Sequence, residues 1–385
     1  MRKKHFLSTL LLVVLSLPML VACGGDDDED EIVKDDGGLV VIDNMNIFYD
    51  HIKYYIYERH LVVSGYDEEF NGIAKIPSTI DINGYVYEVL EIDMSAFQGC
   101  SRLTSVIISD GVTTIYPSAF RDCPNLASVT IGNSMAIISS NAFSGCPNLN
   151  SISIPSSVTF IGSAAFRNTG WYNKQGDGIL YLDNWLLDYK GEKPTGDLVI
   201  NNGTKRIAAY AFRDCTGLTS VSIPNSVIST GYGTFNGCTG LTSVTIPNGL
   251  TYIDEMAFSG CTGLTSVDIP NSVTIIDLGA FSGCTGLTSI IIPNSVTELG
   301  NSIFEGCTGL TTITIGNSVA MIYGDAFRDC SSLNEIHCKA TTPPTCWYSF
   351  GNDHYSRIKL YVPKGTLDAY KKADFWKNFQ TIIEE

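Results

Sequence analysis

Phenylalanine recurs along this chain at a fixed interval of 23 residues. The gap between Phe166 and Phe212 is 46 residues, or two intervals, so the register survives a stretch in which one repeat has lost its pattern. A fixed period of this length is typical of stacked repeats, and we therefore predict a solenoid of 23-residue coils. The two series are Phe97, Phe120, Phe143 and Phe166, and then Phe212, Phe235, Phe258, Phe281, Phe304 and Phe327.

Each repeat has the same order of apolar and polar positions. In Leu264-Thr-Ser-Val267-Asp-Ile269 the apolar residues alternate with polar ones, which predicts a short β-strand with one buried face. Pro270 should end that strand, because proline has no N–H to donate to a ladder. The segment from Val273 to Ile276 predicts a second short extended piece. A coil of this kind cannot bury its own apolar face, so neighbouring coils must stack.

These repeats closely resemble the BspA-type leucine-rich-repeat family of cell-surface proteins. The resemblance lies in Ala257-Phe-Ser-Gly-Cys-Thr-Gly-Leu-Thr-Ser-Val-Asp-Ile-Pro-Asn-Ser-Val273 and in the near copy from Ala280 to Val296. Together with the ends of the solenoid it covers about residues 60–385. It implies a mainly β, leucine-rich-repeat solenoid, and it is far more specific for the fold than for the function.

Three segments depart from the repeat and predict the domain organisation. Residues 40–95 hold alternating apolar strands and predict an amino-terminal β cap that covers the first open edge. Residues 96–333 should form the solenoid, with a β-hairpin inserted at about 168–207 that turns at Asp183-Asn184. Residues 334–385 resemble the carboxy-terminal cap of the family. We expect a helix there from about Gly365 to Phe379, with Trp376 and Phe379 packed on the last coil.

The amino terminus predicts export and lipid anchoring. Residues 1–22 have the positive start and the apolar stretch of a signal peptide, and Leu20-Val21-Ala22-Cys23 resembles a lipobox. Acyl chains on Cys23 would anchor the protein in a membrane, and residues 23–39 should form an acidic tether. The acidic run resembles an export signal of surface lipoproteins, which implies exposure on the outer membrane. The alternatives are a simple signal peptide with a chance cysteine, and a tether without a sorting role.

Charge and motifs exclude several classes of function. The net charge is −16 and only 24 residues are Lys or Arg, so there is no positive field to attract nucleic acid. The five histidines form no His-Glu-x-x-His motif, and no nucleophile elbow or phosphate-binding loop is present. The repeats present no fixed carboxylate pair. We therefore expect no enzyme, no cofactor and no metal site.

Cysteine occupies the third position after the repeat phenylalanine. One cysteine per coil predicts a column of buried free thiols, although neighbouring coils are close enough for disulfides. Cys338 and Cys346 lie in the predicted cap, where one disulfide and two free thiols are equally compatible with the sequence. The column consists of Cys100, Cys123, Cys146, Cys215, Cys238, Cys261, Cys284, Cys307 and Cys330.

The polar positions of the Leu-x-x-Val-x-Ile strands should point outward and form a hydroxyl-rich face. Such a face offers hydrogen bonds to an extended polypeptide or a glycan, and solenoids bind through extended surfaces of this kind. The simpler explanation is that Thr and Ser suit exposed strands. The candidate binding residues are Thr219, Ser220, Ser222, Thr242, Ser243, Thr245, Thr265, Ser266, Asp268, Thr288, Ser289, Thr311, Thr312 and Thr314, with Ile291 among them in the same face.

Aromatic residues in the insert are a second candidate site. Trp171, Tyr172 and Trp185 could form a glycan-binding platform or the core of the inserted hairpin. Exposure of Trp171 and Trp185 together would favour glycan binding. The leading hypothesis is an adhesin-like protein that binds host or matrix macromolecules, as the family resemblance implies. A glycan-capturing accessory lipoprotein and a periplasmic scaffold are the alternatives.

Overall fold

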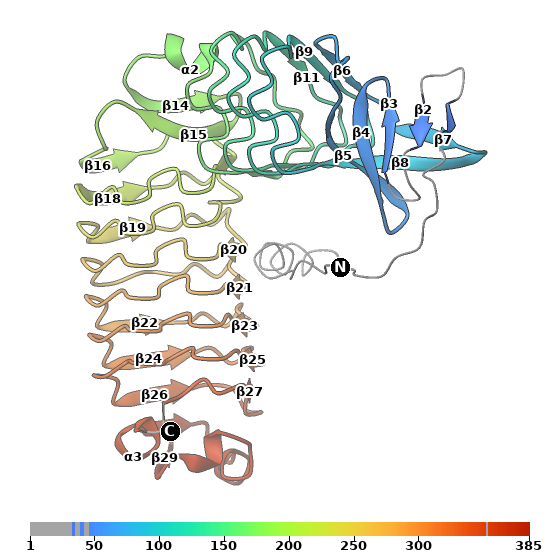
Figure 1. The fold of residues 1–385 in the computed structure, drawn as a ribbon. Coiled ribbons are helices and arrows are strands. Elements are labelled where there is room, and N and C mark those ends of the chain that lie inside the picture. Colours follow the sequence, from blue (N-terminus) through green and yellow to red (C-terminus); the bar gives the residue numbers. More distant parts are fainter. Residues whose placement is uncertain (1–32, 35–38, 42–45, 352) are drawn as a thin grey trace.

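The computed structural model describes residues 33–34, 39–41, 46–351 and 353–385. The predicted signal peptide, Cys23 and the acidic run lie outside the described residues. The described chain forms a solenoid in two arms that meet at a bend (Figure 1). We call residues 46–169 the amino-terminal arm and residues 196–385 the carboxy-terminal arm. Among the helices of these segments, none has both the length and the apolar character needed to cross a membrane.

An antiparallel meander closes the free end of the amino-terminal arm. It contains β3 (Asn46–Tyr49), β4 (Ile52–Tyr57) and β5 (His60–Tyr66), and β1 (Val33–Lys34) and β2 (Leu39–Val41) extend it at its outer edge. Strand β5 then pairs in parallel with β8 (Tyr85–Ile92), which is also the second strand of a hairpin with β7 (Thr79–Ile82). The meander therefore covers the first coil, as a cap should.

The solenoid begins earlier than residue 96, where the sequence pattern had placed its start. Strand β6 (Ile73–Ile76) pairs in parallel with β9 (Ser105–Ile108), and β8 pairs in parallel with β10 (Thr114–Ile115). The first coil has no Phe-x-x-Cys phrase, which is why the pattern missed it. Tyr66 replaces the repeat phenylalanine in this coil. Its ring lies parallel to that of Phe97 in the next coil, with the ring centroids 5.6 Å apart.

Successive coils pair through two parallel ladders, which we call the long and the short ladder. They lie on different sides of the carboxy-terminal arm (Figure 1). The long ladder contains β6, β9 and β11 (Ser128–Thr130), and then β16 (Gly196–Val199), β18 (Leu218–Ser222), β19 (Ser243–Thr245), β22 (Ser289–Ile291), β24 (Thr312–Ile315), β26 (Glu335–Cys338), β28 (Lys359–Val362) and β29 (Thr381–Glu384). The short ladder contains β8, β10, β12 (Ile137–Ile138) and β13 (Phe160–Ile161), and then β17 (Arg206–Ile207), β20 (Tyr252–Ile253), β21 (Ile275–Ile276), β23 (Glu298–Leu299), β25 (Met321–Ile322) and β27 (Thr345–Cys346).

The repeat phenylalanines stack inside each arm. Rings in adjacent coils are nearly parallel, with centroids 5.2 Å apart for Phe120 and Phe143 and 5.5 Å apart for Phe212 and Phe235. The repeat Leu, Val, Ile and Cys side chains are buried beside them. The buried side chains form two separate clusters, one in each arm. The repeat thus produces a continuous core in each arm, with an interruption at the insert.

The insert is the joint between the arms. It contains the short helix α2 (Gly170–Lys174) and the hairpin of β14 (Gly178–Leu182) and β15 (Trp185–Lys190), which turns at Asp183-Asn184 as predicted. Strand β15 also pairs in parallel with β17, so it belongs to the short ladder. Trp185 and Leu187 are buried in the core of the amino-terminal arm, whereas Leu186 is buried in the core of the carboxy-terminal arm. Because side chains alternate along a strand, β15 serves both cores at once.

The carboxy-terminal cap differs from the expected helix. Residues 365–379 contain only α4 (Leu367–Tyr370) and a 3₁₀ turn at Trp376–Asn378, after α3 (His354–Arg357). Phe375 has φ of 66°, which ends any continuous helix before Trp376. The bend lets the Trp376 Nε1 donate to the carbonyl of Pro344 at 2.7 Å. Trp376 and Phe379 both contact Phe350 at the end of the ring stack, so their predicted packing on the last coil is confirmed.

Candidate functional site

The predicted hydroxyl face lies along the long ladder of the carboxy-terminal arm. We define the hydroxyl face as the fourteen candidate residues from Thr219 to Thr314 named above, together with Ile291. All of these side chains are exposed except Ser220, Thr312 and Thr314, which are half-buried. Parallel pairing keeps equivalent positions in register, for example Ser220 with Ser243 and Ser289 with Thr312. Between these two sheets, the strand predicted for Leu264 to Ile269 is reduced to an isolated bridge of Asp268 with Thr245. The hydroxyls therefore stand in rows at the strand spacing of roughly 4.8 Å.

Some hydroxyls of this face are already engaged within the protein. Thr242 donates to the carbonyl of Thr219, and Thr311 donates to that of Thr288, each at 3.0 Å. At the end of the face near the joint, Asp197 accepts from Thr219 at 3.0 Å and from Ser220 at 2.6 Å.

These two hydrogen bonds lower the pKa of the Asp197 carboxyl, and the bond from Ser220 has the larger effect. The sequence pattern did not predict Asp197, because the coil that contains it has lost the repeat.

The centre of the face is more varied than a plane of hydroxyls. Ile291 is 67% exposed and pairs with Thr314, which in turn pairs with His337 of β26. The imidazole of His337 lies parallel to the ring of Tyr361, with the centroids 4.4 Å apart. One row of the long ladder thus offers an aliphatic side chain, a hydroxyl and an aromatic stack in succession. An elongated ligand would meet several kinds of contact along this row.

A groove borders the hydroxyl face next to the joint. Its volume is about 520 Å³, and Thr245 contributes to both the face and the groove. The rest of its lining comes from three consecutive turns, whose backbone and side-chain amides offer donors and acceptors. The other lining residues are Asn202, Gly203, Ile223, Pro224, Asn225, Ser226, Ile246, Pro247 and Asn248.

The insert does not present an aromatic platform. Trp185 is only 3% exposed, and Trp171 is half-buried against the core of the amino-terminal arm. The ring of Tyr172 lies under the Lys190 ammonium, with 5.5 Å from the nitrogen to the ring centroid. Trp171 and Trp185 are thus not exposed together, and the observation that would have favoured a glycan site here is absent.

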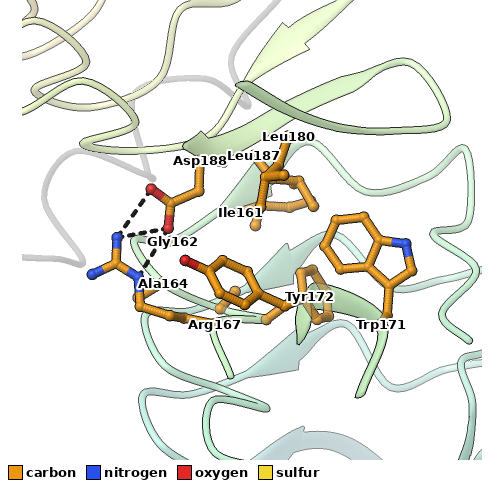
Figure 2. A pocket seen from close by; sticks show the side chains of 11 residues that line it. Ile161, Gly162, Ala164, Arg167, Trp171, Tyr172, Leu180, Leu187 and Asp188 are labelled. Atoms are coloured by element: carbon orange, nitrogen blue, oxygen red, sulfur yellow. Dashed lines mark hydrogen bonds and ion pairs between the residues drawn. The ribbon is translucent and has the colours of Figure 1, made fainter. Parts of the chain in front are cut away.

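An ion pair fastens the joint instead (Figure 2). The Arg167 guanidinium donates to both carboxylate oxygens of Asp188, with contacts of 2.7 to 3.1 Å. Asp188 lies on β15 and is buried, and burial raises the pKa of its carboxyl against the opposing effect of Arg167. The adjoining cavity is about 10 Å³, which holds roughly one water molecule. This site is a structural clamp between the last coil of the amino-terminal arm and the insert.

Acidic side chains gather on the short ladder of the carboxy-terminal arm. Asp254 accepts from the N–H and hydroxyl of Thr230 at 3.0 and 2.7 Å and from the Gly231 N–H at 3.1 Å. Burial, together with the charge of Asp277, raises the pKa of Glu255 to about 7. Within the described segments, no group of His, Cys, Asp and Glu has the arrangement of a metal site.

The cysteine column is buried, and its thiols are free. Cys338 and Cys346 are likewise free and buried, so the cap holds two thiols instead of a disulfide. Burial raises the pKa of Cys261 and of Cys307 to about 12. A buried thiol that stays protonated is a poor nucleophile and a poor metal ligand.

Comparison with solved structures found several similar bacterial proteins. A leucine-rich repeat protein from Bacteroides ovatus is 25% identical, with 88% of this chain and 99% of that chain covered and a TM-score of 0.34. A leucine-rich cell surface protein from Faecalibacterium prausnitzii is 24% identical, with 77% and 95% covered and a TM-score of 0.35. The pneumococcal vaccine antigen PcpA is 21% identical, with 88% and 98% covered and a TM-score of 0.38.

Among curated proteins, none matches the chain. The family model described as the BspA type leucine rich repeat region matches in six copies, over residues 68–174, 189–307 and 263–370. These matches span well over half of the sequence and include both arms. The chain therefore belongs to the BspA-type leucine-rich-repeat family.

Proposed function

We propose that this chain is a lipid-anchored cell-surface protein that binds a host or matrix protein through its hydroxyl face. The signal peptide, the lipobox-like segment before Cys23 and the acidic run support the location. Membership of the BspA-type family supports a binding role. The hydroxyl face adds a surface on which binding would occur.

The observation that carries the proposal is the set of unengaged hydroxyls in register. Ser243, Thr245, Ser266 and Ser289 are exposed, and their hydroxyls make no hydrogen bond within the described part of the chain. A hydroxyl both donates and accepts, so a row of them matches the alternating N–H and C=O groups of an extended polypeptide. Short side chains also lose little conformational entropy on binding. The groove beside Thr245 gives such a polypeptide a place to enter.

The first test is protease treatment of intact cells, with immunodetection of the protein. We expect the solenoid to be cleaved along with a known surface protein while a periplasmic marker stays intact. Protection of the solenoid under the same conditions would overturn the surface location and favour a periplasmic scaffold.

The second test maps the binding face. The purified protein is applied to an array of extracellular matrix proteins, and the variant S243R/S289R is compared with T251R/A320R. Both variants place arginines on exposed positions, the first on the hydroxyl face and the second beside the short ladder. We expect only the first to lose binding. Equal binding by the two variants would show that the hydroxyl face is not the binding surface.

A further inference from the structure

Two adjacent aromatic side chains stand exposed at the end of the short ladder. Trp347 is 56% exposed and Tyr348 is 76% exposed, directly after β27 (Figure 1). Of the other three tryptophans in the sequence, Trp185 and Trp376 are buried and Trp171 is half-buried. Trp347 is therefore the tryptophan that solvent reaches most freely. Large apolar side chains exposed side by side are typical of a binding site.

The backbone of the last coil holds these two rings outward. The Trp347 N–H donates to the carbonyl of Ile322 at 3.1 Å, and the Tyr348 carbonyl accepts from the Asp325 N–H at 3.1 Å. Tyr348 has φ of 50°, and the equivalent positions Ser302 and Asp325 have φ of 51° and 55°. Glycine and small polar residues suit this left-handed conformation, whereas a bulky side chain is uncommon in it. Tyr348 thus occupies a strained turn position without the compensation of burial.

Hydrogen-bonding groups and a third ring border the pair. Phe375 lies edge-on to Tyr348, with the centroids 5.3 Å apart and the rings inclined by 70°. Asp325 is exposed, and its carboxylate makes no ion pair or hydrogen bond within the described residues. The Oδ1 of exposed Asn301 accepts from the Gly324 N–H at 2.9 Å, which leaves the amide NH₂ available.

We propose that Trp347 and Tyr348 form a saccharide-binding platform. The apolar C–H face of a pyranose would stack on the exposed rings, while its hydroxyls would bond to Asp325 and Asn301. A protein partner would also cover exposed rings, but here an unengaged carboxylate and an amide stand beside them, and these groups match the hydroxyls of a sugar. A nucleic acid would also stack on aromatic rings, but a chain with net charge −16 repels its phosphates.

This platform is independent of the hydroxyl face. Trp347 follows a strand of the short ladder, whereas the hydroxyl face belongs to the long ladder (Figure 1). It is also distinct from the aromatics of the insert, which are packed into the joint. A protein that binds a polypeptide on one face and a glycan on another would be able to bind glycoproteins through both sites.

The test measures saccharide binding to the purified full chain. The probes are maltoheptaose, xylohexaose and triacetylchitotriose, and the readout is acrylamide quenching of tryptophan fluorescence, with calorimetry for affinity. We expect at least one sugar to protect Trp347 from quenching in a saturable manner. No saturable effect from any of the three would overturn the proposal.

Variants separate the platform from the fold and from the hydroxyl face. W347A and Y348G should each weaken binding by about fivefold or more. Y348G places glycine where the left-handed backbone favours it, so the fold should be preserved. The control is Y85A, because Tyr85 is 73% exposed but lies in the amino-terminal hairpin. Unchanged binding in W347A and Y348G, with loss in S243R/S289R, would place the sugar on the hydroxyl face and overturn the platform alone.

Discussion

The thiol of Cys284 donates a hydrogen bond to the backbone carbonyl of Phe258, 3.2 Å away in the preceding coil. The spacing of 26 residues is one coil plus the three residues that separate the repeat phenylalanine from the repeat cysteine. Seven of the nine sulfurs in the column point in this way at a carbonyl of the preceding coil, which explains how free thiols lie at close range. The same bond joins Cys123 to Phe97, Cys146 to Phe120, Cys238 to Phe212, Cys261 to Phe235, Cys307 to Phe281 and Cys330 to Phe304.

The buried column predicts that the native protein resists thiol reagents. Burial raises the pKa of Cys284 well above its ordinary value, so almost no thiolate is present at about pH 8. We expect Ellman's reagent to react slowly with the folded protein and completely after denaturation. Rapid reaction of several thiols without denaturant would contradict a packed column.

The two cores predict two unfolding transitions. Phe120 is buried in the amino-terminal arm and Phe281 in the carboxy-terminal arm, and each belongs to a different core. Replacing either with alanine should cost about 3–5 kcal/mol in its own arm. In calorimetry, F120A and F281A should each lower the midpoint temperature of a different unfolding transition. A single transition that moves equally in both variants would show that β15 couples the arms into one unit.

The clamp at the joint predicts a stability loss in D188N. The substitution removes the carboxylate that receives the bidentate contact from Arg167, and Asp188 is buried. We expect unfolding to become easier by about 1–3 kcal/mol, because Arg167 keeps part of its hydration. Urea denaturation measures the change. D329N is the control, since the ion pair of Asp329 with Arg328 lies at the exposed surface. Its loss should change the free energy of unfolding by less than about 0.5 kcal/mol.

The acidic cluster predicts that stability falls as pH rises. The folded-state pKa of Glu255 is about 7, above the ordinary value of 4.5, so the folded chain binds a proton that the unfolded chain has released. The stabilisation from that proton is complete below about pH 4.5 and is lost as pH approaches 7.

Between about pH 5 and pH 8 the Tm should fall by roughly 2–4 °C more in the native protein than in E255Q. E192Q, at an exposed position, should behave as the native protein does. Equal pH dependence in all three proteins would contradict the raised pKa.

Much of this architecture was predictable because it is periodic. The alternation in Leu264 to Ile269 correctly predicted that Leu264 and Val267 are buried and that the polar residues between them are exposed. The predicted strand itself is wrong, because this segment makes only an isolated bridge at Asp268. The turn at Asp183-Asn184 was predictable from local chemistry, because the two residues join segments of strand-forming composition. The location, the lipid anchor and the ligand remain predictions.

The sequence by itself determined the 23-residue coil, the thiol column and the outward rows of hydroxyls, because each repeats the same local pattern. Only the tertiary structure decided the bend, the burial of Trp185 and the exposure of Trp347 and Tyr348. Strand β15 is apolar on both faces, and no local pattern says which core each face will join. Outside the repeat, the sequence likewise does not distinguish an aromatic side chain that packing buries from one that a turn exposes to solvent.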